Sequence, residues 1–186
     1  MPANNVAGAQ GKSTRQGIVQ IFTGDGKGKT TAAIGTAIRA LGHGLKVLVV
    51  VFMKGDYPYG EWEALGTFPD ARIVRFGFQE FTDPNNIRPE ECEQAESALA
   101  IARQAMLSGE YDLIILDEVN IAAAWKLVDI EKVVQLIKDR PPQVELILTG
   151  RYADKRLIDL ADLVTECIKV KHPYDRGTLA RPGIEF

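Results

Sequence analysis

The sequence predicts one α/β domain of the RecA-like P-loop class, with a mostly parallel sheet of about six strands and helices on both faces. Three observations support this. Short apolar runs alternate with amphipathic segments, the pattern of parallel strands joined by crossover helices. A glycine-rich turn joins the first apolar run to the first helical segment. The 186 residues, 46% hydrophobic and 25% charged, suit one domain with one core.

The expected elements follow one another along the chain. Runs of apolar residues predict strands at 18–22, 47–52, 73–78, 113–116, 146–148 and 163–170. The run 47–52 is apolar at every position, which is typical of a central parallel strand. Helices are expected at 29–41 and 89–108, the second stopped by Gly109, and a third is expected after Asp129.

The N-terminal segment and the composition indicate which kind of protein this is and which partners to expect. Residues 1–16 are rich in Gly, Ala, Asn, Ser and Gln, which predicts a flexible arm before a domain at 17–186. The arm lacks the apolar centre of a signal peptide, and no apolar run reaches the roughly 20 residues that cross a bilayer. Two cysteines outside any C-x-x-C pattern favour a reduced, cytoplasmic protein. With a net charge of -3, neither a nucleic-acid nor a membrane partner is expected.

The strongest functional pattern is TGDGKGKTT at residues 23–31. Glycines let backbone N–H groups converge on phosphate oxygens, and the following helix N-terminus adds a positive partial charge. Lys29 adds a full charge, and the hydroxyl of Thr30 can bind Mg²⁺. Thr23 stands where the usual pattern has its first glycine. Strand, glycine-rich turn and helix in this order predict a P-loop that binds nucleotide phosphates.

Two acidic residues follow the fourth predicted strand. Asp117 and Glu118 come directly after the run LIIL, and a P-loop with Mg²⁺ needs an acid at the end of a neighbouring strand. Adjacent acids at a strand end can also be solvated loop residues. Because the P-loop pattern is present, we favour the metal role.

Other nucleotide-binding classes lack their patterns or fit less well. The N-K-x-D motif of base-specific GTPases and the H-R-D and D-F-G motifs of protein kinases are absent from the sequence. A small-molecule kinase would release ADP, but no arginine-rich lid for a transferring phosphoryl group is evident. A nucleotide-dependent switch would have little need of aromatic residues beside the nucleotide. Both alternatives stay open on these residues alone.

Several motifs together resemble the P-loop corrinoid adenosyltransferases, a family distinct from the trimeric adenosyltransferases. They are TGDGKGKTTAA (23–33), LGHG (41–44), FMKG (52–55), LDEVN (116–120), LTGR (148–151), DLADLVTE (159–166) and KHPYDRG with ARPGIEF (171–186). Thr at the first P-loop position belongs to this family's pattern. The resemblance implies transfer of the 5′-deoxyadenosyl group of ATP to cobalt(I) of a corrinoid, with release of triphosphate, in adenosylcobalamin biosynthesis or salvage.

The resemblance also implies roles for individual residues. Lys29, Thr30 and Glu118 would be catalytic, and Thr30, Glu118 and Asp117 would hold Mg²⁺ or Mn²⁺. The triphosphate would be held by Gly24, Asp25, Gly26, Lys27, Gly28, Lys29, Thr30 and Thr31. A homodimer is implied, with a flavin-type reductase as electron donor.

Two aromatic residues are candidates for the corrinoid side of the site. The family usually has Gly-Phe-Thr-Trp, whereas this chain has GFQEFT at 77–82. Phe78 matches the pattern, and Phe81 is the candidate to replace the missing Trp. Both would shield the lower face of the cobalt, which makes cobalt(II) easier to reduce. The alternative is that both are core aromatics at a strand end.

Overall fold

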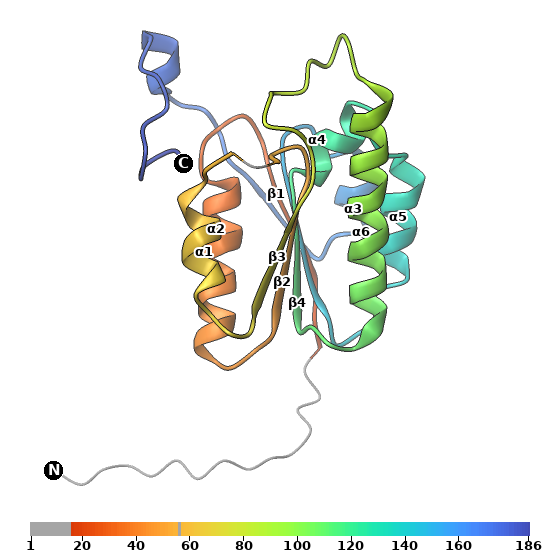
Figure 1. Cartoon of the computed structure of the whole chain (residues 1–186). Coiled ribbons are helices and arrows are strands. Elements are labelled where there is room, and N and C mark those ends of the chain that lie inside the picture. The colour runs from red at the N-terminus through yellow and green to blue at the C-terminus, as the bar shows by residue number, and fades with distance from the viewer. Residues whose placement is uncertain (1–15, 56) are drawn as a thin grey trace, which may run out of the picture.

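The computed structural model describes residues 16–55 and 57–186, which form one six-stranded sheet with helices on both sides (Figure 1). The predicted arm, apart from Gln16, lies outside the described residues. The strands are β1 (Val19–Thr23), β2 (Val47–Val51), β3 (Ala71–Arg75), β4 (Leu113–Asp117), β5 (Glu145–Thr149) and β6 (Leu163–Glu166). All neighbouring strands are parallel, in the order β3-β2-β4-β5-β1-β6. The predicted fold class is therefore confirmed.

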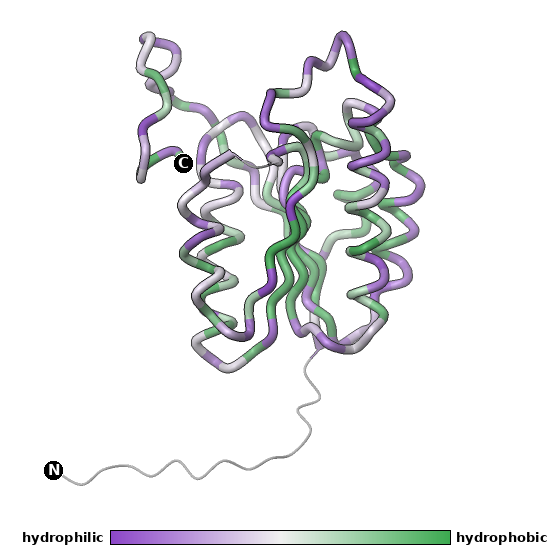
Figure 2. Tube along the Cα trace, in the orientation of Figure 1, coloured by the Kyte–Doolittle hydropathy of each residue, from purple (hydrophilic) through white to green (hydrophobic). Residues whose placement is uncertain are grey.

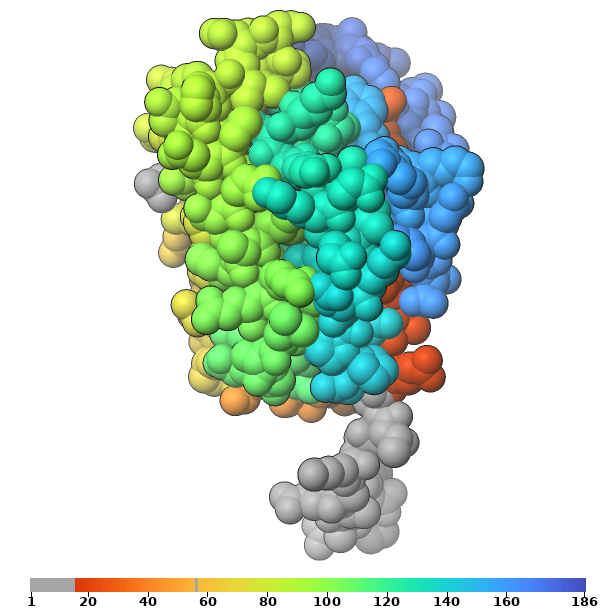
Figure 3. Space-filling model, turned by 90° about the vertical axis from the view of Figure 1, so that its right-hand side faces the viewer, coloured from red at the N-terminus to blue at the C-terminus, as the bar shows by residue number. Residues whose placement is uncertain are grey.

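The helices lie in two layers. They are α1 (Lys29–Gly42), α2 (Gly60–Gly66), α3 (Pro89–Ser108), α4 (Val119–Ala124), α5 (Ile130–Lys138) and α6 (Lys155–Leu160), followed by the 3₁₀ turn η1 (Pro173–Arg176). Helices α1 and α2 pack on one face of the sheet, and helices α3, α4, α5 and α6 pack on the opposite face (Figure 1). Figure 3 shows α3, in green, and α5, in teal, side by side over that second face.

The core lies in the middle strands. Every residue of β2, β4 and β5 is buried, and Figure 2 shows the sheet as the most hydrophobic layer. Continuous apolar runs are what a strand covered by helices on both faces requires. The edge strand β6 is exposed at all four positions and ends at Glu166. The expectation that this strand continues to residue 170 was wrong, and the exposed Ile168 and Val170 lie beyond it.

Some element boundaries differ from the prediction for local reasons. The third strand spans Ala71–Arg75 rather than 73–78, so Phe78 lies in the following loop. Gly77, with φ 105°, turns the chain just before it. Helices α2, α4 and α6 were not predicted, because each has seven residues or fewer and is too short to display a helical period.

Two helix ends confirm the capping signals in the sequence. Gly109 closes α3 in the left-handed conformation, with φ 73°. The side chain of Asp129 caps α5 by accepting a hydrogen bond from the backbone N–H of Glu131.

The sheet topology determines where functional residues meet. Parallel strands end at the same edge, so the segments after β1, β2, β4 and β5 gather there. The chain beyond β6 joins this edge, since the carbonyl of Cys167 accepts a 2.6 Å hydrogen bond from the N–H of Gly26. Within the described ranges, the helices are all too short or too polar to cross a membrane.

Candidate active site

The P-loop lies between β1 and α1, as predicted. Gly24 and Gly28 have φ values of 93° and 121°, a region that favours glycine, and α1 begins at Lys29. The Lys29 ammonium donates a 2.7 Å hydrogen bond to the carbonyl of Gly26. Burial lowers the pKa of Lys29, and although the Glu118 carboxylate acts in the opposite direction, the pKa remains below its ordinary value. Lys29 therefore lies inside the loop and near Glu118.

Hydrogen bonds join the P-loop to the ends of β4 and β5. The hydroxyl of Thr30 donates to Asp117 Oδ1 at 2.8 Å, and the hydroxyl of Thr149 donates to the same oxygen at 2.7 Å. The backbone N–H of Glu118 donates to Thr149 Oγ1 at 3.0 Å. Asp117 is completely buried. The sequence-predicted Thr30, Asp117 and Glu118 are thus brought to one point.

Glu118 differs from Asp117 in both backbone and exposure. It has φ 65°, a left-handed conformation that costs a non-glycine residue about 1 kcal/mol or more and that clusters at functional sites. Its side chain is 22% exposed. A Cβ on Gly150 would lie 3.2 Å from Glu118 Oε2, so this glycine leaves room for the carboxylate. The Glu118 side chain is therefore open to solvent, whereas the Asp117 side chain is enclosed.

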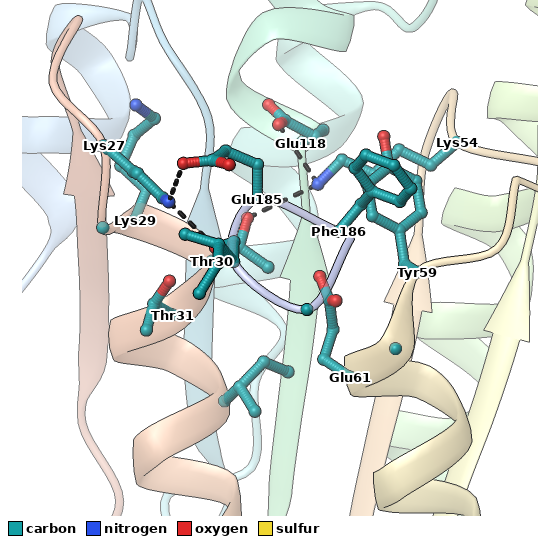
Figure 4. A pocket seen from close by; sticks show the side chains of 15 residues that line it. Lys27, Lys29, Thr30, Thr31, Lys54, Tyr59, Glu61, Glu118, Glu185 and Phe186 are labelled. Carbon is teal, nitrogen blue, oxygen red and sulfur yellow. Dashed lines mark hydrogen bonds and ion pairs between the residues drawn. The ribbon is translucent and has the colours of Figure 1, made fainter. Parts of the chain in front are cut away.

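Lys54 joins this cluster, and the sequence analysis gave it no role. Its ammonium lies 2.7 Å from Asp117 Oδ2. It also lies 3.3 Å from Glu118 Oε1 and 3.4 Å from Thr30 Oγ1 (Figure 4). Burial alone would lower the pKa of Lys54, but the two carboxylates outweigh it and raise the pKa above its ordinary value. One signal could have found it: Lys54 closely follows β2, the strand that pairs with β4.

A cavity of about 480 Å³ opens over the P-loop. We call it the phosphate cavity. Its walls are the P-loop, the loop after β2, the start of α2 and the C-terminal residues 183–186. Lys27 crosses from one wall to the other, donating 2.9 Å hydrogen bonds to the carbonyl of Ile184 and to Glu185 Oε1 (Figure 4). The contribution of the C-terminal segment was missed, because residues more than 150 positions apart meet here.

A second cavity, of about 320 Å³, lies beside the first. We call it the aromatic cavity. Four residues line both cavities: Lys29, Lys54, Tyr59 and Glu118. The aromatic cavity is further lined by Met53, Phe81, Thr82, Ile121, Trp125 and Arg151.

The two aromatic candidates differ in their surroundings. Phe81 lines the aromatic cavity and is 85% exposed, which excludes the core alternative for this residue. Phe78 is 37% exposed, and the Arg88 guanidinium lies 4.7 Å from its ring centroid. Trp125 packs against the core and also lines this cavity.

The oxygen ligands at the strand ends fit a magnesium ion. Among the described residues no group of three or more His, Cys, Asp or Glu side chains gathers to hold a metal. A cation would therefore rely on the Thr30 hydroxyl, one or two carboxylates and substrate phosphate oxygens. Mg²⁺ is usually bound in this way, keeping several waters rather than filling an all-protein cage.

The sequence profile of the family described as ATP:corrinoid adenosyltransferase BtuR/CobO/CobP matches residues 15–186. The chain belongs to this family of adenosyltransferases. It is 38% identical over 179 residues to the corrinoid adenosyltransferase of Escherichia coli K12, covering 96% of this chain and 89% of that protein. The corrinoid adenosyltransferase of Pseudomonas aeruginosa is 36% identical over 178 residues, covering 96% and 87%. CobA of Salmonella typhimurium is 36% identical over 184 residues, covering 96% and 89%.

A solved structure, the cytoplasmic domain of EssC, has a similar fold. The TM-score is 0.53 at 13% sequence identity, and the match covers 91% of this chain and 36% of that chain. At this identity the likeness concerns the fold alone.

Family membership confirms the predicted reaction class. This adenosyltransferase uses ATP and a corrinoid as substrates, in cobalamin biosynthesis or salvage. The small-molecule kinase and the nucleotide-dependent switch are thereby set aside.

Proposed function

We propose that the phosphate cavity binds the triphosphate of ATP, that the aromatic cavity receives the corrinoid, and that the ribose 5′ carbon lies where the two cavities meet. The observation that carries this proposal is the set of four residues that line both cavities. A reaction between cobalt and C5′ needs the two substrates to touch at one point. Adjacent cavities with a shared wall meet that requirement.

The chemistry at this boundary needs positive charge on one side. The electron pair of cobalt(I) forms the bond to C5′, and the pair of the C5′–O bond departs with the triphosphate. Backbone N–H groups of the P-loop, together with Lys29, stabilise the negative charge that gathers on the leaving group. Lys27 adds a second ammonium in the same cavity.

Mg²⁺ is the proposed metal, and it supplies further charge to the departing triphosphate. Thr30 and Glu118 would hold it, with Asp117 positioning Thr30 from behind. The burial of Asp117 and the partial exposure of Glu118 support this division of roles.

Phe81 is the better candidate to contact the corrinoid, with Trp125 on the same wall. Flat aromatic side chains beside an open cavity suit the face of a large planar macrocycle. Phe78 is proposed to act indirectly, through the loop that carries both residues.

We further propose that the protein is a cytoplasmic homodimer and that a flavin-type reductase is its electron donor. Sedimentation velocity tests the dimer, and reduction of bound cobalt(II) corrinoid by a flavin protein tests the donor.

The direct test follows the formation of the cobalt–carbon bond. The protein is incubated with Mg-ATP and chemically reduced cobalt(I) corrinoid, and the absorbance of the alkylated corrinoid is recorded. We expect turnover that requires Mg²⁺ and falls at least a hundredfold in Lys29→Ala and in Thr30→Ala, both still folded by circular dichroism. Wild-type protein that forms no cobalt–carbon bond would refute the proposal. Turnover that is the same before and after EDTA treatment would refute the requirement for a metal ion.

A further inference from the structure

Lys54 occupies the centre of the oxygen cluster at the strand ends. Its ammonium has three N–H donors, and three side-chain oxygens lie within 3.4 Å of it, one each from Asp117, Glu118 and Thr30. Two of these residues, Thr30 and Glu118, are proposed to hold the divalent cation, and Asp117 positions Thr30. The side chain is only 15% exposed, and its ammonium also lies 5.3 Å from the centroid of the Tyr59 ring.

The backbone around Lys54 is held in place by close packing. Met53 has a left-handed φ of 64°, unusual for a non-glycine residue. A Cβ on Gly55 would lie 2.6 Å from the backbone of Phe78, and one on Gly77 would lie 2.7 Å from Met53 Cα. The loops after β2 and β3 are therefore packed backbone to backbone. The base of the Lys54 side chain is fixed, while its four-carbon stem leaves the ammonium free to reorient.

Lys54 also lies where the reacting bond is proposed to be. Of the four residues shared by the two cavities, two are cations, Lys29 and Lys54. Lys29 belongs to the P-loop and faces the Gly26 carbonyl inside it. Lys54 approaches from the other side, from the end of β2, next to Glu118. An ammonium in this position can reach an oxygen at the junction between the triphosphate and the ribose.

We propose that Lys54 is a further catalytic residue of the adenosyl transfer: it offsets one of the two negative charges of the Asp117–Glu118 pair before the divalent cation binds, then donates a hydrogen bond to the α-phosphate oxygen that leaves C5′. The inference rests on the proposed function. Two carboxylates carry two negative charges, and Lys54 cancels one. The cation takes over their neutralisation and frees the ammonium. As the C5′–O bond breaks, its electron pair stays on that oxygen and the ammonium stabilises it, while the cobalt(I) pair forms the new bond. No proton is transferred.

Two opposite effects distinguish this role from simple support of the fold. In Lys54→Met, which keeps the length and loses the charge, the carboxylates lack their internal cation. Mn²⁺ should then bind about tenfold more tightly in the absence of nucleotide and corrinoid, since a charged hydrogen-bonding competitor is gone. With pre-reduced cobalt(I) corrinoid, kcat should fall about a hundredfold while KM for ATP changes little. Lys54→Arg should restore part of kcat.

The experiment titrates Mn²⁺ by electron paramagnetic resonance and measures turnover in wild type, Lys54→Met and Lys54→Arg. Lys46→Met is the matched control, an exposed lysine at the opposite end of the same strand, and should leave both readings unchanged. Thermal unfolding shows whether each variant is folded. If Lys54→Met does not fold, the Mn²⁺ affinity and kcat of Lys54→Arg decide the result. Unchanged or weaker Mn²⁺ binding in Lys54→Met, or unchanged kcat, overturns the inference. Wild-type protein that forms no cobalt–carbon bond refutes the proposed function instead, so the two failures are distinguishable.

Discussion

Lys27 of the P-loop is bound by Glu185 of the C-terminal segment, with Nζ 2.9 Å from Oε1. Arg181 holds the same carboxylate through its backbone N–H at 2.9 Å and its guanidinium at 3.0 Å. The contact with Lys27 forms part of the wall of the phosphate cavity. If the triphosphate lies in this cavity as proposed, its oxygens and the Glu185 carboxylate compete for one ammonium.

The first prediction concerns this competition. Glu185→Gln removes the competing charge and should tighten Mg-ATP binding about threefold, the scale expected for an exposed ion pair. Isothermal titration calorimetry measures it. Asp175→Asn is the control, because Asp175 pairs with Lys169 away from the phosphate cavity. Weaker binding in Glu185→Gln would mean that Glu185 supports the ATP site rather than competing with it.

The second prediction concerns pH. Hydrogen bonds from Arg181 and Lys27 lower the pKa of Glu185 from 4.5 to about 2. Because the pKa of Glu185 is lowered, its contacts with Arg181 and Lys27 stabilise the folded protein fully above pH 4.5. This stabilisation is lost as the pH falls toward about 2 and the carboxylate is protonated. The ratio of ATP affinities between wild type and Glu185→Gln should therefore be constant from about pH 6 to pH 8. A ratio that changes through this range would show that another group controls the contact.

The third prediction separates the two acids. Glu118→Gln should weaken Mg²⁺ activation about tenfold and change the free energy of unfolding by less than about 0.5 kcal/mol, because the side chain is partly exposed. Asp117→Asn should cost about 2 kcal/mol of stability, because a buried hydrogen-bonded network loses its charge. Mg²⁺ titration and urea unfolding give the two quantities. If Asp117→Asn instead weakened Mg²⁺ activation and Glu118→Gln destabilised the fold, Asp117 would be the metal ligand and Glu118 the structural residue.

Much of this arrangement could be predicted from the sequence because it is local. Strand, glycine-rich turn and helix are contiguous, so the P-loop was found with its residues in place. Asp117 and Glu118 end a neighbouring strand, and the common edge of a parallel sheet brings them to Thr30. The predicted pairing of these residues needed only the topology.

The parts that were missed depend on contacts between distant segments. Lys54 follows its strand like any loop lysine, and only the β2–β4 pairing brings it to Asp117. Glu185 and Lys27 are 158 positions apart. Helix α2 has seven residues, begins and ends with a glycine, and has too few turns for a periodic signal. The sequence did not separate Phe78 from Phe81. Hydrophobic periodicity does not show that the Phe78 ring packs against Arg88 whereas the Phe81 ring is exposed.

The fourth prediction contrasts these two aromatics. If Phe81 shields the lower face of the cobalt, Phe81→Ala should be slow with cobalt(II) and a mild flavin-type reductant, and should recover much of its rate with pre-reduced cobalt(I). Its melting temperature should stay near that of wild type, because the ring is 85% exposed. Phe78→Ala should lose the Arg88 contact, worth about 0.5–1 kcal/mol, and slow both assays alike. Equal losses for Phe81→Ala in both assays would leave the corrinoid side unassigned.

The identity of the phosphate product tests whether cobalt attacks the ribose carbon while the P-loop holds the whole triphosphate. The reaction with Mg-ATP and reduced corrinoid is quenched at successive times, and its phosphates are separated by ion-exchange chromatography. We predict one inorganic triphosphate for each cobalt–carbon bond, because attack at C5′ leaves the three phosphates joined. ADP or pyrophosphate released as the first product, in step with turnover, would contradict it.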